Sequence, residues 1–136
     1  MFKTVLFPID NSRESREAAE TVANIVQTYN ARLVLLSVVP EQTEGQDATA
    51  DGMMSPEAVA ELLKNAHNAF AKQRIEAETI ERVGQPPFVI CDVADEIEAN
   101  LIVMGSRGMG LTEEESSSSV TNKVINLSPC PVLIVP

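Results

Sequence analysis

Residues 101–108, LIVMGSRG, decide how this chain folds. Four apolar residues stand in a row and are followed by Gly105 and Gly108. Continuous hydrophobicity over so short a run is typical of a β-strand that is covered on both faces. The two glycines let the chain leave that strand by a sharp turn and expose backbone amides that a Cβ atom would shield. The stretch therefore predicts a buried strand that ends in a turn whose amides can approach an anion.

The rest of the chain alternates short apolar runs with helical patterns. Further strands are predicted at 4–7, 33–36 and 132–135, and one of weaker composition at 78–83. Between the strands, apolar residues fall on one face of a helix in four groups: Ala18, Val22, Ile25 and Val26; Val59, Leu62, Leu63, Ala66 and Phe70; Ile90, Val93, Ala94 and Ile97; Val120, Val124 and Leu127. Strands that alternate with helices are joined by crossovers, so their sheet is parallel. We expect an α/β fold in the order β-α-β-α-β-α-β-α-β, which is a doubly wound five-stranded parallel sheet with helices on both faces.

Length and charge narrow the function classes. The 136 residues suit one domain, 1–136, with its own hydrophobic core. A net charge of −10 opposes sequence-independent binding to nucleic acid phosphates, so neither DNA nor RNA is expected as a partner. No apolar run approaches the ~18 residues of a membrane span, and the beginning of the chain lacks the features of a signal peptide. We expect a cytoplasmic protein with no membrane partner.

One polar segment interrupts the alternation. Residues 40–55, PEQTEGQDATADGMMS, are acidic, contain glycine and offer little to bury, so we expect a mobile surface loop there. Ser55-Pro56-Glu57 then predicts a helix start, with serine as the N-cap and proline at the first helical position.

A ligand crevice is expected beyond the carboxyl ends of the strands, where the winding of an open α/β sheet reverses. Three predicted strands end at 8–10, 37–39 and 104–108. Asp10 follows its apolar run directly, which places a carboxylate at the mouth of this crevice. Asp10 and the two residues after it are also good capping residues for the helix that comes next. Capping and ligand contact are compatible, and both roles stay open for Asp10.

Three segments carry a family resemblance: Pro8-Ile9-Asp10, NLIVMGSRG at 100–108, and SPCPVLIV at 128–135. Together they resemble the universal stress protein family. The resemblance covers the whole chain and includes the step Gly84-Gln85-Pro86 before the third helix. It implies an adenine nucleotide alpha hydrolase-like fold and a homodimer formed through the last strand, here 131–136. In one branch of the family it also implies ATP bound at the carboxyl ends of the strands.

The ATP-binding branch has two glycines separated by two residues, then nine residues, then a third glycine followed by serine or threonine and usually valine. Gly105 and Gly108 match the first pair, and the same frame puts Ser118 at the third glycine, with Ser119 and Val120 matching the two positions after it. The serine hydroxyls and the free amides of a helix start form an anion site in principle. The resemblance thus implies these nucleotide-binding residues: Pro8, Ile9, Asp10, Val38, Met104, Gly105, Arg107, Gly108, Ser118, Ser119 and Val120.

The same segment departs from that branch in its charge. Ser118 replaces the third glycine, and Glu113, Glu114 and Glu115 add three negative charges near the expected phosphates. At ~8 Å each charge pair costs about 0.5 kcal/mol in a water-like dielectric, which sums to several kcal/mol for a triphosphate. Arg107 is a nearby cation that offsets part of this cost. We therefore expect ATP binding to be weak or lost, whereas AMP brings less charge. The alternative is an ATP- or AMP-binding protein with a nucleotide-gated regulatory role.

The serines at 116–119 allow two further interpretations. An acidic, serine-rich run is typical of a solvated loop that includes a helix N-cap. Acidic neighbours also suit acidophilic kinases, and a phosphate at a helix start is stabilised by the amides and the helix dipole. In that case the anion at this helix start would be a phosphate attached to the protein itself.

No catalytic constellation emerges from the sequence. His67 is the only histidine and is expected on the surface, without a nucleophile nearby. Cys91 and Cys130 are expected to be reduced, mostly buried thiols. The carboxylates at 92–96 are expected on a polar helix face, so no metal site is predicted. These patterns favour a dimeric stress-response protein that acts by binding a protein partner, with no certain cofactor, rather than an enzyme.

Overall fold

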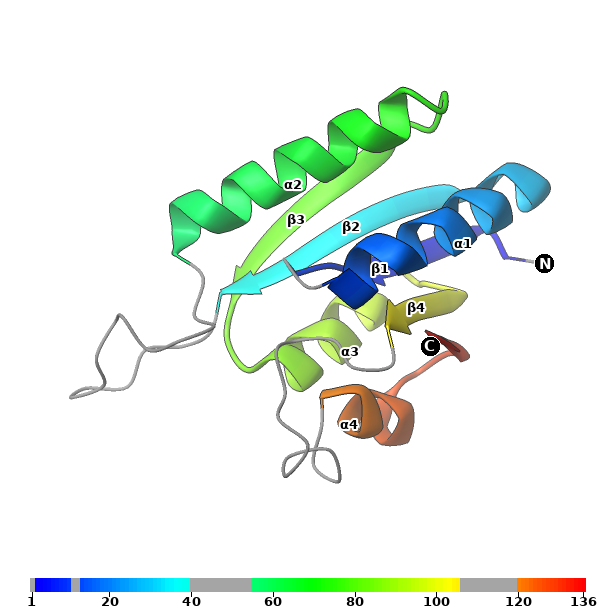
Figure 1. Ribbon diagram of the computed structural model, residues 1–136. Coiled ribbons are helices and arrows are strands. Elements are labelled where there is room, and N and C mark those ends of the chain that lie inside the picture. The colour runs from blue at the N-terminus through cyan, green and yellow to red at the C-terminus, as the bar shows by residue number, and fades with distance from the viewer. Residues whose placement is uncertain (1, 11–12, 40–54, 106–119) are drawn as a thin grey trace.

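The computed structural model describes residues 2–10, 13–39, 55–105 and 120–136. Strands and helices alternate along these residues (Figure 1). In chain order they are β1 (Thr4–Pro8), α1 (Arg13–Tyr29), β2 (Arg32–Val39), α2 (Pro56–Ala71), β3 (Ala77–Val83), α3 (Pro86–Glu96), β4 (Leu101–Gly105), α4 (Val120–Leu127) and β5 (Val132–Val135). Each predicted strand and helix is present. The loop predicted at 40–55 lies outside the described residues except for Ser55, so its mobility stays a prediction.

The five strands form one parallel sheet in the order β3-β2-β1-β4-β5. β1 lies in the middle and pairs with both neighbours, because Val5 stands opposite Leu33 of β2 and Leu101 of β4. The chain winds outward from β1 to β3, crosses back through α3, and winds the other way to β5. This topology confirms the predicted doubly wound α/β fold and places the reversal of winding between β1 and β4.

Side chains alternate along β1 between the two faces of the sheet. Phe7 belongs to one core cluster, with Val22 of α1 and Val59 of α2. Leu6 belongs to a second cluster, which includes residues of α3 and α4 such as Ile90. Figure 1 shows the two helix pairs on opposite sides of the sheet. We refer to these sides as the α1/α2 face and the α3/α4 face.

Two polar contacts position α2. The Ser55 hydroxyl accepts the N–H of Ala58 at 3.1 Å and Pro56 begins the helix, which confirms the predicted helix start. His67 is half-buried, and its Nδ1 lies 2.8 Å from the carbonyl oxygen of Ala77. A carbonyl oxygen can only accept, so this ring nitrogen donates. His67 is thus only partly exposed, because its helix packs against β3 and the ring joins the two elements.

Gly84 carries the turn from β3 into α3. Its φ is +151°, and a Cβ atom built on it would lie 2.8 Å from Cγ2 of Val89. The N–H of Gly84 donates to the carbonyl oxygen of Val39 at 3.0 Å, which holds the turn against the end of β2. The backbone conformation and the close contact both exclude a side chain at this position.

We predict that Gly84→Ala lowers the free energy of unfolding by about 1–3 kcal/mol, because alanine would adopt a strained φ and collide with the stiff Val89 side chain. Urea unfolding followed by circular dichroism measures the change. Gln85→Ala is the matched control, since Gln85 makes no side-chain cap hydrogen bond, and it should change stability by less than about 0.5 kcal/mol. Equal effects of the two substitutions would contradict this account of Gly84.

Candidate functional site

The carboxyl ends of β1, β2 and β4 meet at one edge of the sheet, next to the reversal of winding. Beyond the end of β1, the N–H of Ile9 donates to the carbonyl oxygen of Leu36 at 2.8 Å. The pairing of β1 with β2 therefore continues past Pro8 and brings Asp10 beside the end of β2. In open α/β sheets this edge is where ligands bind, so we describe it as the candidate site.

Two buried hydroxyl groups hold the backbone of this edge. Ser37 is 1% exposed, and its Oγ donates to the carbonyl oxygen of Ile9 at 3.1 Å. Thr121 is 5% exposed, and its Oγ1 donates to the carbonyl oxygen of Gly105 at 3.3 Å. A buried carbonyl without a partner is costly, so each hydroxyl stabilises one strand end where the sheet ladder stops. Neither residue was predicted. The signal for Ser37 was a lone hydroxyl inside the apolar run of β2.

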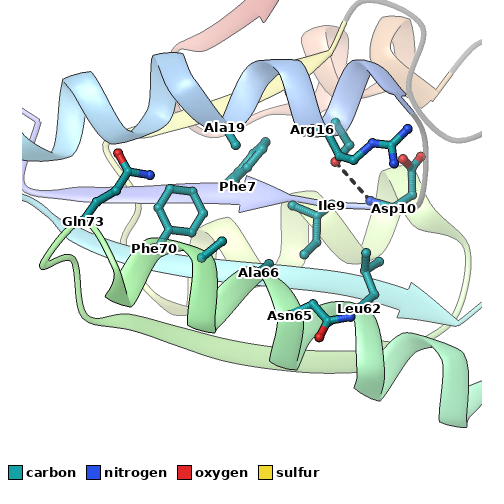
Figure 2. Close-up of a pocket in the computed structure, with 12 residues that line it drawn as sticks. Phe7, Ile9, Asp10, Arg16, Ala19, Leu62, Asn65, Ala66, Phe70 and Gln73 are labelled. Atoms are coloured by element: carbon teal, nitrogen blue, oxygen red, sulfur yellow. Dashed lines mark hydrogen bonds between the residues drawn. The ribbon is translucent and has the colours of Figure 1, made fainter.

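A third buried hydroxyl lies at the start of α1. The N–H of Asp10 donates to Oγ of Ser15 at 3.2 Å, which ties the end of β1 to the first turn of the helix. The Asp10 side chain is half-buried. Figure 2 shows its carboxylate near Arg16 of α1. The residues between Asp10 and α1, 11–12, lie outside the described part of the chain, so the capping role of Asp10 stays a prediction.

The predicted nucleotide-binding residues divide between the two faces of the sheet. Val38 and Met104 belong to the core cluster of the α3/α4 face, and Val120 packs against that cluster. Ile9 belongs to the cluster of the α1/α2 face. The structure thus brings Val38 and Met104 together on one face and separates Ile9 from them, because neighbouring residues of a strand point to opposite sides.

Three of the other predicted residues lie along the carboxyl edge itself: Pro8, Asp10 and Gly105. Pro8 and Gly105 are the last residues of β1 and β4, the two strands that flank the reversal of winding. The remaining predicted residues are Arg107, Gly108, Ser118 and Ser119, and they lie outside the described residues. Their part in a site, like the phosphorylation of 116–119, stays a prediction.

A cavity of about 450 Å³ opens next to this edge on the α1/α2 face. Phe7 of β1 and Ile9, just beyond that strand, line it together with residues of α1 and α2, and Asp10 and Arg16 lie at one end (Figure 2). The cavity was not predicted from the sequence. The sequence indicates this cavity only weakly, because small residues such as Ala19 and Ala66 occur in many core helices.

The two cysteines are less buried than predicted. Cys91 of α3 and Cys130, just before β5, are both half-buried and pack against the core of the α3/α4 face. Burial raises the pKa of both thiols, and the nearby Asp92 raises that of Cys91 further. Both thiols are therefore weak nucleophiles near neutral pH.

Metal coordination and membrane spanning each require a particular arrangement of residues. Within the described ranges, no group of three or more histidine, cysteine or acidic side chains is placed to hold a metal ion. Among the helices that are described, none is both long and apolar enough to cross a membrane.

We predict that Thr121→Val lowers the free energy of unfolding by about 1–3 kcal/mol, because valine keeps the volume and leaves the carbonyl of Gly105 without its donor. Thermal and urea unfolding measure the loss. Thr79→Val, on the exposed side of β3, is the matched control and should stay within about 0.5 kcal/mol of the parent protein. A Thr121→Val protein as stable as this control would show that the hydroxyl does not support the strand end.

Comparisons with known proteins agree with this architecture. Residues 1–136 match the model of the universal stress protein family. The chain is 60% identical to Universal stress protein Sll1654 of Synechocystis sp. over 136 residues, which are 100% of this chain and 87% of that protein. It is 33% identical to Universal stress protein YxiE of Bacillus subtilis, with 99% of each covered. A crystal structure of a universal stress protein in complex with cAMP is 27% identical, has a TM-score of 0.78, and is matched over 99% of this chain and 97% of that one. The chain belongs to the universal stress protein family.

Proposed function

We propose that this universal stress protein acts by binding rather than by catalysis, and that its carboxyl edge takes an adenine nucleotide with a single phosphate while ATP binds weakly or not at all. One observation carries the proposal: the ends of β1, β2 and β4 converge where the winding reverses, and buried hydroxyls hold two of these ends in place. A rigid edge of this kind is where α/β proteins bind nucleotides.

The described side chains suit the base and sugar of a nucleotide better than its phosphates. Val38 and Met104 belong to one apolar cluster, where the face of a purine can pack. Asp10 supplies a carboxylate, which accepts hydrogen bonds from an amino or hydroxyl group and repels an anion. The nucleotide would therefore lie with its base toward β1 and β2 and its phosphate toward the connection from β4 to α4.

The negative charge of that connection would limit the number of phosphates that a bound nucleotide can carry. Glu113, Glu114 and Glu115 lie within it in the sequence. Each glutamate costs about 0.5 kcal/mol against each phosphate charge at ~8 Å in a water-like dielectric, so the penalty grows with the number of phosphates. The solved relative in complex with cAMP supports a ligand with one phosphate. An ATP- or AMP-binding protein with a nucleotide-gated role remains the alternative, and ATP affinity separates the two.

The arrangement of titratable groups supports binding over catalysis. The ring of His67 is engaged by the carbonyl of Ala77, at the junction of α2 with β3. The thiols of Cys91 and Cys130 have raised pKa values, which disfavours the reactive thiolate. The protein would then act by binding a protein partner.

We predict that calorimetric titration of nucleotide-free protein, with Mg²⁺ present, gives an affinity for AMP at least about tenfold higher than for ATP. The reason is the added negative charge of the triphosphate near the three glutamates. ATP binding as tight as AMP binding, at micromolar dissociation constants, would overturn this choice in favour of the alternative.

Ser118→Gly combined with Glu→Gln at 113, 114 and 115 should raise the affinity for ATP by at least about tenfold and leave that for AMP less changed. Glu→Gln at the exposed positions 57, 61 and 81 makes the same change in net charge elsewhere and is the matched control. An equal gain in the control would show that the affinity for ATP depends on the net charge of the protein and not on where the glutamates lie. The absence of any gain would show that the segment does not limit ATP binding.

We further propose that the protein is a homodimer paired through residues 131–136. β5 is an edge of the sheet, and its Leu133 is 37% exposed. The opposite edge, β3, is protected by charge, because Glu78 forms an ion pair with Arg32 that lowers the pKa of Glu78, and Arg82 pairs with Glu96. Charged edges resist pairing with another chain and apolar edges favour it.

We predict that Leu133→Glu converts a dimer into a monomer in sedimentation velocity at micromolar concentration, because two like charges would face each other across the strand pair. Leu127→Glu is the control, since Leu127 of α4 is 51% exposed and lies outside β5. A monomeric parent protein, or dimers unaffected by Leu133→Glu, would count against the proposed interface.

Two further parts of the proposal concern the protein as a whole. We propose that residues 1–136 act as a single domain and that the protein works in the cytoplasm. The free state of Cys91 and Cys130 agrees with a reducing compartment.

A further inference from the structure

The cavity on the α1/α2 face is a second place where a ligand fits. Its volume of about 450 Å³ lies within the ~300–1,000 Å³ typical of small-molecule pockets. It lies between α1 and α2, with β1 beneath it (Figure 2). Val38 and Met104 pack into the core of the opposite face of the sheet, so the cavity is separate from that part of the proposed nucleotide site.

Small side chains create the space. Ala19 of α1 faces Ala66 and Ala69 of α2 across the cavity, and larger residues there would close it. Leu62 and Phe70 complete the wall on the α2 side. The lining between the two ends is therefore mostly apolar, so a ligand gains by placing apolar surface there and loses by placing a charge there.

Two aromatic rings shape the interior. Phe7 of β1 and Phe70 of α2 contact each other edge to face, with ring centroids 6.3 Å apart and an interplanar angle of 86°. Both rings line the cavity. A flat aromatic ligand can extend such a pair with a further edge-to-face or offset contact, which strengthens binding beyond the area that it buries.

Polar groups lie at the two ends of the cavity. Gln73 lines one end, where its carbonyl oxygen accepts a hydrogen bond from Nε2 of Gln27 at 3.3 Å, which joins α1 to the segment that follows α2. Asp10 and Arg16 lie at the other end, and Asn65 lines the α2 side (Figure 2). The carboxylate of Asp10 and the guanidinium of Arg16 together present acceptors and donors with no net charge. This end suits one uncharged hydrogen-bonding group better than an ion.

We propose that the cavity between α1 and α2 binds an uncharged aromatic small molecule that carries one hydrogen-bonding group. The aromatic body lies against Phe7 and Phe70, and the polar group points toward Arg16. This ligand differs from a nucleotide, which is charged and belongs to the carboxyl edge and the α3/α4 face. The proposal does not depend on nucleotide binding. Ile9 and Asp10 line one end of the cavity and are also predicted nucleotide contacts, so the two sites are neighbours at that end.

The test uses the uncharged fluorophore 6-propionyl-2-dimethylaminonaphthalene, whose emission shifts to the blue in apolar surroundings. We expect saturable binding of one molecule per chain. Ala66→Leu fills the cavity and should raise the dissociation constant at least about tenfold without lowering the melting temperature, because it occupies empty space. Ala60→Leu makes the same change on the exposed side of α2 and should leave binding unchanged.

Ala19→Leu fills the cavity from α1 and should weaken binding in the same way. Fluorophore binding unaffected by both filling variants would overturn the proposal. If either variant fails to fold, nuclear Overhauser measurements on the parent protein test the proposal instead. They should show contacts from the fluorophore to the Ala66 methyl group and the Phe70 ring. Their absence would overturn the proposal as well.

Saturating AMP distinguishes this site from the nucleotide site. We expect the fluorophore to bind equally well with AMP present. Displacement by AMP would place both ligands in one site and overturn the proposal of a separate one. A protein that binds the fluorophore and no AMP would support the cavity and count against the proposed nucleotide function, so the two proposals fail independently.

Discussion

The burial of β1 on both faces is the constraint on which the rest of this structure depends. β1 pairs with β2 on one side and β4 on the other, and its alternating side chains enter two separate cores. A strand in this position must be apolar throughout, and helices must cover both its sides. The connections on its two sides lead the chain in opposite directions, and they part at the carboxyl edge between β1 and β4.

Polar support at that edge arises from the same constraint. Where the ladder of the sheet stops, carbonyl groups remain that cannot reach water, and the hydroxyls of Ser37 and Thr121 satisfy two of them. Ser37 and Thr121 are not among the predicted contact residues. They fix the backbone of Ile9 and Gly105, which are.

The two faces differ in what they can bind. The α3/α4 face holds Val38 and Met104 in its core, and we propose that the base of a nucleotide lies there. The α1/α2 face holds an apolar cavity lined by two phenylalanine rings. The edges of the sheet differ in the same way, with ion pairs on β3 and an apolar strand at β5. The side chains that the strands direct to each surface therefore determine what that surface can bind.

The sequence by itself determined the strands, the helices, the parallel sheet, the start of α2 at Ser55 and the family, because periodicity, capping and motif spacing are written over a few neighbouring residues. It also located the edge at which Pro8, Asp10 and Gly105 meet. Only the tertiary structure decided which predicted residues share a face, why His67 is half-buried, where buried hydroxyls are needed and that a cavity lies between α1 and α2. These features depend on contacts between residues far apart in the chain, and on the space that remains once two helices have packed on one sheet.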